Sequence, residues 1–191
     1  MSPRAAATVI LLRGGSEQLE LLLVRRTPAA RFMAGAWVFP GGAVDPADGN
    51  GQTGLRAAAL RELREEAGMA LAPEPELVAF ARWITPAELP IRFDTWFYLA
   101  TAPAGASPQV DGSEIVDFRW LRPVDALTDF EAGELELAFP TRKQLEQLGR
   151  FSSAEALLAH ARALENAIKP VQPRVVGSGE QARIILPDDG N

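Results

Sequence analysis

Three glutamates, Glu62, Glu65 and Glu66, lie in a segment that the sequence predicts to be helical. Their spacing of i, i+3 and i+4 places the three carboxylates on one face of that helix. Like charges at these positions repel one another, so the arrangement costs stability unless cations lie between them. Arg61 is placed to bridge to Glu65, and Arg64 lies beside them. The segment is therefore either a solvated, salt-bridged helix face or a face that binds a divalent cation.

The composition limits which metal such a face could bind. The chain has no cysteine, and His160 is its single histidine. Thiolate zinc sites, iron–sulfur clusters, disulfides and cysteine nucleophiles are therefore excluded. A metal ion would be held by oxygen ligands, which favours Mg²⁺, Mn²⁺ or Ca²⁺. His160 lies in a helical segment rich in Ala and Leu, and we expect it to be structural or exposed.

A glycine turn precedes the acidic helix. Phe39-Pro40-Gly41-Gly42 places the end of a short strand and a tight turn before the carboxylates. Two glycines allow the backbone to approach a ligand closely, and the Gly41 carbonyl could be a further metal ligand. A strand, a glycine loop and an acidic helix together could hold a metal ion next to a polyphosphate.

These residues resemble the Nudix box, whose pattern is G-x5-E-x7-R-E-U-x-E-E-x-G-U, where U is aliphatic. Gly42 supplies the first glycine, and Arg61-Glu62-Leu63-x-Glu65-Glu66-x-Gly68-Met69 matches the second half at every specified position. The first half departs from the pattern, because the spacing is five residues longer and the early Glu is missing. Thr53 stands at the helical offset of that Glu, and Asp45 and Asp48 are the nearest acidic substitutes.

A second motif overlaps the first. The run Leu22-Leu23-Val24-Arg25-Arg26-Thr27-x3-Arg31-x3-Gly35-x3-Phe39-Pro40-Gly41-Gly42 resembles the signature L-L-T-x-R-[SA]-x3-R-x3-G-x3-F-P-G-G of Nudix coenzyme A diphosphatases. Val24 and Thr27 are its mild departures. The longer box loop, with the segments 82–86 and 92–95, further resembles the peroxisomal-type branch of that group.

Three arginines concentrate positive charge beside the glycine turn. Coenzyme A carries a diphosphate and a 3′-phosphate, so guanidinium groups on Arg25, Arg26 and Arg31 could bind substrate next to Gly42. The alternative is that Arg25 and Arg26 alternate along a strand, with one solvated and the other paired with an acidic neighbour.

The resemblance implies a metal-dependent hydrolase that cleaves the diphosphate bond of a small-molecule nucleoside diphosphate derivative. Coenzyme A or acyl-CoA would give 3′,5′-ADP and a 4′-phosphopantetheine product. ADP-ribose, NADH and dinucleoside polyphosphates are alternative substrates, and a non-catalytic Nudix-fold binding module or a purely structural domain are alternative functions. No covalent nucleophile is needed.

The resemblance also implies roles for individual residues. Glu62, Glu65 and Glu66 would hold Mg²⁺ or Mn²⁺, with the Gly41 carbonyl as an extra ligand. Glu62 would either ligate the metal or take the proton of the attacking water. Arg61 would orient the carboxylates. A further acid is expected from a later loop, and we select Glu114, with Asp111 as the second choice.

The hydrophobic pattern along the chain predicts the helices and strands that position these residues. Strands are expected over 7–12, 20–25, 36–39, 77–84, 95–101 and 115–121. Helices are expected from about Thr53 to Gly68, over 141–148 and over 153–168, the last capped by Ser152 with Glu155. A terminal hairpin is expected over 171–176 and 183–186. The aromatic residues 83, 93, 96 and 97 could wall a pocket, but we expect core positions for them.

Strands and helices alternate without a βαβαβ rhythm, which indicates α/β layers around a mixed sheet. With the resemblance, the expected fold is a Nudix-like α/β/α sandwich with C-terminal helices and a terminal hairpin. The length of 191 residues predicts one domain, with 141–191 as a C-terminal extension.

Charge and hydropathy limit the partners. The net charge of −6 gives no positive field for nucleic acid. The apolar run 9–12 ends at Arg13-Gly14-Gly15. The run is too short for a membrane span or a secretory signal. A cytoplasmic protein without a membrane partner is expected. A homodimer, formed through an edge strand of the terminal hairpin, is expected from the family alone.

Overall fold

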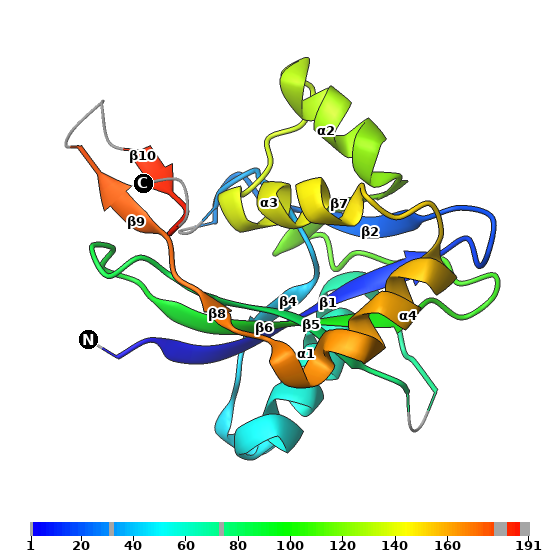
Figure 1. Ribbon diagram of the computed structural model, residues 1–191, viewed down its shortest axis with the longest axis horizontal. Coiled ribbons are helices and arrows are strands. Elements are labelled where there is room, and N and C mark those ends of the chain that lie inside the picture. The colour runs from blue at the N-terminus through cyan, green and yellow to red at the C-terminus, as the bar shows by residue number, and fades with distance from the viewer. Residues whose placement is uncertain (1, 31–32, 73–74, 178–182, 188–191) are drawn as a thin grey trace.

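The apolar segments near the N-terminus form the centre of a mixed β-sheet. The computed structural model describes residues 2–30, 33–72, 75–177 and 183–187. Within these residues the sheet has eight strands, in the order β3-β2-β1-β6-β5-β8, with β4 beside β1 and β7 beside β2 (Figure 1). The strands are β1 (Arg4–Arg13), β2 (Glu20–Arg26), β3 (Trp37–Val38), β4 (Gly41–Ala43), β5 (Val78–Ile84), β6 (Phe93–Thr101), β7 (Ile115–Leu121) and β8 (Pro170–Val171).

Strand β1 joins the two halves of this sheet. It pairs in parallel with β6 from Arg4↔Phe93 to Leu12↔Thr101. Along its other edge it pairs antiparallel first with β4, at Thr8↔Gly41, and then with β2, at Leu12↔Leu21. Both parallel and antiparallel neighbours are therefore present, as the sequence pattern predicts.

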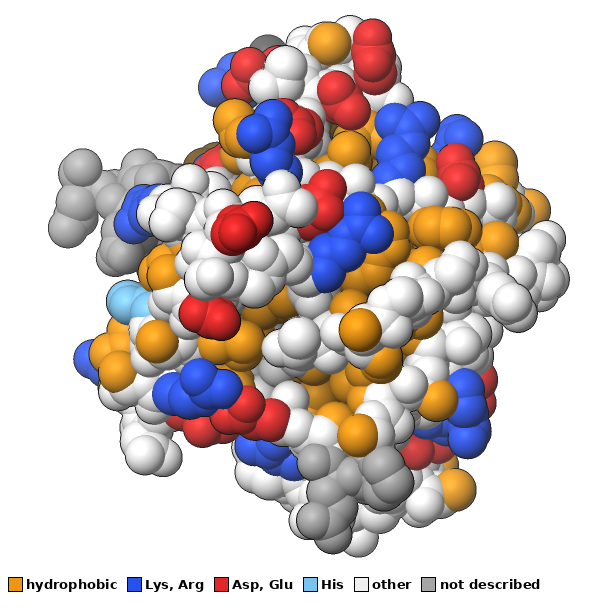
Figure 2. All heavy atoms as spheres, turned by 90° about the vertical axis from the view of Figure 1, so that its right-hand side faces the viewer, with side chains coloured by type: hydrophobic (Ala, Val, Ile, Leu, Met, Phe, Trp, Pro, Cys, Tyr) orange, Lys and Arg blue, Asp and Glu red, His pale blue; other side chains and the backbone are white. Residues whose placement is uncertain are grey.

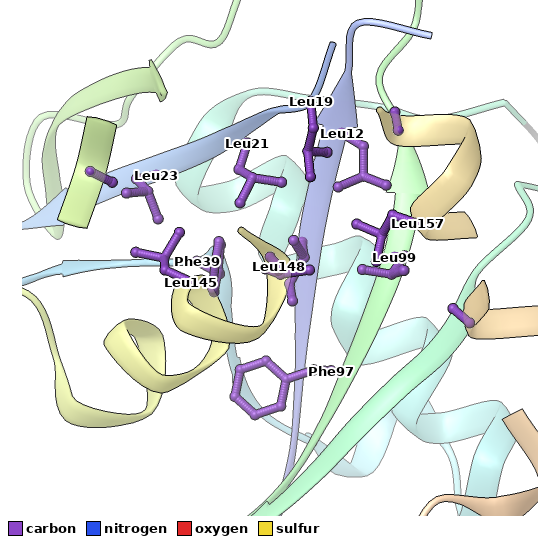
Figure 3. Close-up of a cluster of buried hydrophobic side chains, with 14 of the residues drawn as sticks. Leu12, Leu19, Leu21, Leu23, Phe39, Phe97, Leu99, Leu145, Leu148 and Leu157 are labelled. Atoms are coloured by element: carbon purple, nitrogen blue, oxygen red, sulfur yellow. The ribbon is translucent and has the colours of Figure 1, made fainter. Parts of the chain in front are cut away.

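Helices cover both faces of the sheet. They are α1 (Gly51–Ala67), α2 (Pro123–Glu131), α3 (Phe139–Leu148) and α4 (Ala154–Leu164). Val9 and Leu11 of β1 pack in the core cluster that includes α1. Ile10 and Leu12 belong to the opposite cluster, which includes α3 and α4 (Figure 3). Because side chains alternate along a strand, the continuous apolar run 9–12 supplies side chains to both cores. The fold is therefore an α/β/α sandwich.

Helix α1 carries the three glutamates and is anchored by small and apolar side chains. Leu55, Ala58, Ala59 and Leu63 are buried against the sheet. The helix ends at Gly68, as predicted, where a left-handed backbone with φ of 63° lets the Gly68 N–H donate to the Arg64 and Leu63 carbonyls. It begins at Gly51, two residues before Thr53. The predicted loop before it contains the 3₁₀ helix η1 (Pro46–Asp48).

The predicted short strand ends before the two glycines, as expected, but Gly41 and Gly42 form a strand and not a tight turn. The short strand β3 ends at Val38, and the chain then re-enters the sheet as β4, Gly41–Ala43. β3 pairs with β2, whereas β4 pairs with β1. The chain therefore crosses from one strand to the next at Phe39-Pro40, and the two glycines come to lie between β1 and α1.

Three helical details differ from the sequence prediction. Helix α2 was not expected; it begins with Pro123 at its first turn and buries Ala126. The cap of α4 is Ser153 rather than Ser152, since the Ser153 hydroxyl accepts from the Ala156 N–H. Helix α4 ends at Leu164, and the remaining turn is the 3₁₀ helix η2 (Glu165–Ala167).

The chain closes with a hairpin, as predicted, which stands apart from the main sheet (Figure 1). Its first strand is shorter than the predicted 171–176, because Val171 belongs to β8 and pairs with β5 in the main sheet. Strands β9 (Arg174–Val176) and β10 (Arg183–Ile185) pair antiparallel. The predicted turn at Gly177-Ser178-Gly179 lies outside the described residues after Gly177. None of the helices in the described ranges is long and apolar enough to cross a membrane. On the face shown in Figure 2, basic and acidic side chains are interspersed, and no continuous basic surface forms among the residues coloured there.

We predict that Leu63→Ala destabilises the protein by about 2–5 kcal/mol, because Leu63 is fully buried between α1 and the sheet and its loss leaves a cavity. Urea denaturation measures the change. Arg64→Ala is the matched control on the exposed side of the same turn, and should change stability by no more than about 0.5 kcal/mol. Equal effects of the two variants would contradict the packing described.

Candidate functional site

A cavity of about 400 Å³ lies where α1, β4, β6 and the start of α3 meet. Its lining contains charged side chains and glycines, mostly from α1 and β4, which we call its polar part, and apolar side chains from β3, β6, α3 and the segments beside them, which we call its apolar part. The polar part comprises Arg26, Gly41, Gly42, Glu62, Glu65, Glu66 and Glu114. The apolar part comprises Met33, Val38, Phe39, Phe93, Phe97, Ala138 and Pro140.

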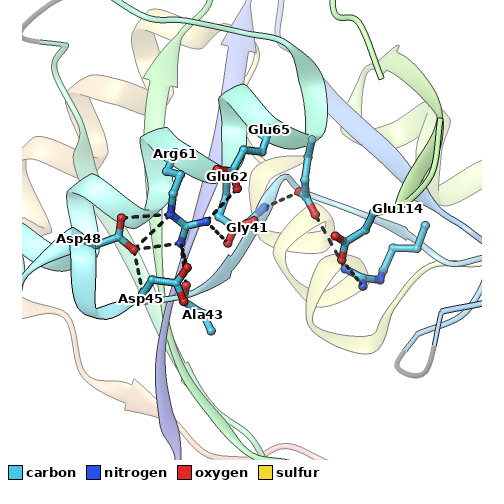
Figure 4. Close-up of polar contacts among 10 residues, drawn as sticks. Gly41, Ala43, Asp45, Asp48, Arg61, Glu62, Glu65 and Glu114 are labelled. Carbon is cyan, nitrogen blue, oxygen red and sulfur yellow. Dashed lines mark hydrogen bonds and ion pairs between the residues drawn. The ribbon is translucent and has the colours of Figure 1, made fainter. Parts of the chain in front are cut away.

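The guanidinium of Arg61 organises the polar part (Figure 4). Its Nη1 donates to Glu62 over 2.8 Å and to Glu65 over 3.0 Å. Its Nη2 donates to the Ala43 carbonyl of β4 over 3.0 Å and to Asp48 over 2.9 Å. Its Nε also donates to Asp48, over 3.1 Å. The bridge to Glu65 that the sequence predicted is present, and Arg61 binds acids of the protein on both sides.

Asp48 is the residue whose importance the sequence did not distinguish. Its side chain is only 6% exposed and pairs with two nitrogens of Arg61. This pairing holds the pKa of Asp48 below its usual value. Asp45 is 58% exposed, and its carboxylate lies 3.8 Å from Arg61. Of the two acidic residues nearest to the position of the missing Glu, Asp48 makes the closer contact with Arg61.

Glu66 is a buried carboxylate with little countercharge. Its side chain is 5% exposed, it accepts a 2.9 Å hydrogen bond from the Gly41 N–H, and Arg26 lies 3.9 Å away. Burial raises the pKa of Glu66 to about 8, and the Gly41 N–H and Arg26 only partly oppose this. Burial also raises the pKa of Glu62, against the effect of Arg61.

The glycines of β4 leave room for these carboxylates. A Cβ at position 42 would overlap the Glu62 carboxylate, and a Cβ at position 41 would overlap the backbone of Ala7 and Thr8 in β1. Since neither glycine has a positive φ, the requirement is one of space and not of backbone conformation.

Glu114 reaches the same cavity from the loop before β7. Its carboxylate accepts a 3.0 Å hydrogen bond from Arg26 Nη2, and its side chain is 60% exposed. Asp111, the second choice, does not line the cavity. Its carboxylate instead accepts from the N–H groups of residues 113, 114 and 115 and so shapes the loop. Burial raises the pKa of Asp111, but the hydrogen bonds to its carboxylate lower it by more, so the pKa falls to about 2.

The three predicted substrate-binding arginines have different positions. Arg26 lines the cavity between Glu66 and Glu114. Arg25 is exposed and donates to the Gly35 carbonyl over 3.3 Å, so the structure does not bring it into the cavity. Successive side chains of a strand point to opposite faces, which explains the difference. Arg31 lies outside the described residues.

The aromatic residues are divided between core and cavity. Trp83 is buried and packs edge-on against Phe139, as expected for the core. Trp96 stacks on Tyr98. Phe93 and Phe97 line the cavity, although Phe97 also belongs to the core cluster. His160 is exposed and lies beside Phe151.

The donor set of the cavity fits a divalent cation of the magnesium type. Its donors are carboxylate oxygens, and the charges of neighbouring carboxylates add to the raised pKa values of Glu62 and Glu66, a repulsion that a cation would relieve. In the described part of the chain, however, no three Asp, Glu or His side chains converge closely enough to form a ready-made metal site. Glu62 and Glu65 each direct one carboxylate oxygen to Arg61, so a metal would bind the other oxygen of each.

Comparison with known proteins identifies the class of fold and site. The family model of the NUDIX domain matches residues 2–145. The chain therefore belongs to the Nudix family and is a Nudix hydrolase. Members of this family generally use divalent metal ions.

Individual relatives agree with this membership. "Putative nudix hydrolase 7" of Caenorhabditis elegans is 27% identical over 91% of this chain and 68% of its own length. "Uncharacterized Nudix hydrolase NudL" of Klebsiella aerogenes is 46% identical over 37% of this chain, and the match spans about half (52%) of that relative. The crystal structure of a NUDIX hydrolase from Alicyclobacillus acidocaldarius is 27% identical, with a TM-score of 0.73 over 83% of this chain and 96% of that one.

We predict that Asp48→Asn lowers kcat about tenfold or more, because Arg61 loses its most buried anion and no longer fixes the Glu62 and Glu65 carboxylates. Steady-state kinetics on a cleaved substrate, with circular dichroism to confirm folding, measures the effect. Asp45→Asn is the matched control, with less than about a twofold change, because that contact is long and exposed. If both variants keep full activity, the pairing of Arg61 with Asp48 is not needed for catalysis.

The raised pKa of Glu66 predicts a pH dependence of stability. In the absence of metal the folded protein keeps a proton on Glu66 up to about pH 8, whereas an unfolded chain loses it near 4.5. This contribution to stability is therefore present at low pH and is lost as the pH rises through this window.

Without divalent metal, the Tm of the wild type should fall between pH 5 and pH 8 by several °C more than that of Glu66→Gln. Thermal unfolding followed by circular dichroism measures this difference. Mg²⁺ at pH 8 should restore the Tm of the wild type but not of the variant. Parallel curves for the two proteins, with the same response to Mg²⁺, would show that Glu66 neither holds the proton nor binds the metal.

Proposed function

We propose that this Nudix hydrolase cleaves the diphosphate bond of coenzyme A or acyl-CoA. The observation that carries the proposal is the position of Arg26, the arginine of the L-L-T-x-R element, which lies in the cavity between Glu66 and Glu114. A guanidinium at this point can bind a phosphate oxygen while the carboxylates bind a metal. The apolar part of the cavity can take the organic groups on either side of the diphosphate.

In this proposal, Glu62, Glu65 and Glu66 hold Mg²⁺ or Mn²⁺, with the Gly41 carbonyl as a further ligand. When bound, the metal lowers the pKa of water and neutralises phosphoryl oxygens. The Gly41 N–H holds Glu66 at the cavity, and the space above Gly42 lets Glu62 reach it. Arg61 orients Glu62 and Glu65 from outside the substrate.

The reaction is a displacement at one phosphorus. A water oxygen forms a bond to that phosphorus, and the bond from it to the bridging oxygen breaks. The bridging oxygen leaves with the other phosphate, so coenzyme A and water give 3′,5′-ADP and 4′-phosphopantetheine. The proton of the water passes to a carboxylate of the cavity. Glu62 and Glu114 are the candidates, because Glu66 serves as a metal ligand in this proposal.

The test is incubation with Mg²⁺ or Mn²⁺ and a panel of CoA, acetyl-CoA, ADP-ribose, NADH and diadenosine polyphosphates. We predict that chromatography shows 3′,5′-ADP from CoA with the wild type. Glu66→Gln should lose at least about 100-fold in rate, because a neutral amide is a poor metal ligand. Glu131→Gln, an exposed glutamate of α2, is the matched control and should keep full activity.

Each other outcome has a definite meaning. Cleavage of another member of the panel instead of CoA, again lost in Glu66→Gln, would contradict the coenzyme A assignment and keep the site. Absence of cleavage with either metal would contradict the catalytic proposal, and the chain would then be a binding module of the family.

A further inference from the structure

The N-terminus of helix α3 borders the cavity. Ala138, Pro140 and Thr141, which are the cap and the second and third residues of this ten-residue helix, all line the cavity. Two backbone hydrogen bonds fix this position: the Trp37 N–H donates to the Glu136 carbonyl, and the Ala138 N–H donates to the Trp37 carbonyl. The start of α3 is therefore held against β3, in the apolar part of the cavity.

This helix end has backbone donors without acceptors. The first N–H groups of a helix have no carbonyl partner within it. Pro140 has no N–H, and neither the Phe139 N–H nor the Thr141 N–H has an acceptor among the described residues. In the same part of the chain no side chain caps the helix at Ala138, and its first turn contains no acidic residue. The positive end of the helix dipole therefore favours an anion in the cavity.

A side-chain hydroxyl at the same helix end also lacks a partner. Thr141 is 4% exposed, and its hydroxyl makes no hydrogen bond with the described residues. Among these residues, the unpartnered polar side-chain atoms that are shielded from solvent are Nε of Arg26 and the amide of Gln144. The Thr141 hydroxyl is not one of them, so it reaches the cavity that the residue lines. Thr8 of β1, 8% exposed, lines the cavity with a hydroxyl in the same condition.

We infer that the N-terminus of α3, with the Thr141 hydroxyl, is a subsite for a phosphate group of the substrate outside its diphosphate. This inference rests on the proposed function. Backbone N–H groups and a hydroxyl at a helix N-terminus are donors that bind phosphate oxygens. The proposed function assigns the diphosphate itself to Arg26 and the metal.

Coenzyme A carries one phosphate outside its diphosphate, the 3′-phosphate of the ribose. ADP-ribose and NADH carry none. Thr141 is therefore a specificity-determining residue, which favours coenzyme A over nucleotides that lack the 3′-phosphate.

The experiment compares two ligands that differ only in the 3′-phosphate, 3′,5′-ADP and 5′-AMP, and it needs no turnover. Calorimetry with Mg²⁺ gives the Kd of each for the wild type, Thr141→Val and Thr141→Ser. We expect the wild type to bind 3′,5′-ADP at least about tenfold more tightly, because hydrogen bonds to a charged group are strong. Thr141→Val should weaken binding of 3′,5′-ADP about tenfold and of 5′-AMP less than about twofold. Thr141→Ser keeps the hydroxyl and should bind both ligands as the wild type does.

Thr128→Val is the matched control, because this exposed threonine of α2 donates to the Val124 carbonyl and does not line the cavity. It should change neither Kd. Without ligand, the Tm of Thr141→Val should equal or exceed that of the wild type, since the lost hydroxyl has no partner within the described protein. If Thr141→Val does not fold, Thr141→Ala should show the same loss of 3′,5′-ADP binding.

Equal affinity of the wild type for the two ligands overturns the inference. Unchanged binding of 3′,5′-ADP by Thr141→Val does so as well. An equal loss for both ligands also contradicts it, since Thr141 would then contact the part of the nucleotide that they share.

Failure of the proposed function is recognised separately, by incubating the wild type with CoA and with 3′-dephospho-CoA. If it cleaves both equally well, the coenzyme A assignment stands and only the inference about the 3′-phosphate is overturned. If it cleaves neither, the coenzyme A assignment fails and the inference fails with it.

Discussion

The polar part of the site depends on one guanidinium. Arg61 joins three successive segments of the chain: the backbone of β4 at Ala43, the loop that carries Asp48, and two glutamates of its own helix. Five donors in a fixed fork can satisfy such a set, which a lysine could not do. The long loop between the glycine turn and α1 is therefore anchored to the carboxylate face and not left free in solvent.

The charges around this guanidinium are unevenly compensated. Glu62 and Glu65 are paired with Arg61, whereas Glu66 is buried against a backbone N–H with Arg26 at 3.9 Å. Burial without a close cation raises the pKa of Glu66 to about 8, and that is the electrostatic condition that a divalent ion would relieve. The glycines of β4 complete the arrangement, because any side chain there would occupy the space of the Glu62 carboxylate or of the β1 backbone.

Local patterns in the sequence predict much of this molecule. The alternation along β1, the helix that ends at Gly68 and the clustering of the three glutamates all follow from periodicity and the left-handed glycine. The Asp48–Arg61 pair could not be predicted. The two residues are 13 positions apart, and their contact depends on the conformation of the chain between them. Which arginine enters the cavity could not be predicted either, because it depends on which face of β2 borders the cavity.

The central claim is that the carboxylates held by Arg61 and Gly41 bind a divalent cation in the cavity beside Arg26. The most direct measurement is a crystal structure of the wild type soaked with Mn²⁺, with the ion located by its anomalous scattering. The account predicts Mn²⁺ bound to oxygens of Glu62 and Glu66, with the Asp48–Arg61 pair intact. Mn²⁺ bound elsewhere, or no contact of Glu62 and Glu66 with Mn²⁺ at saturating concentration, would contradict it.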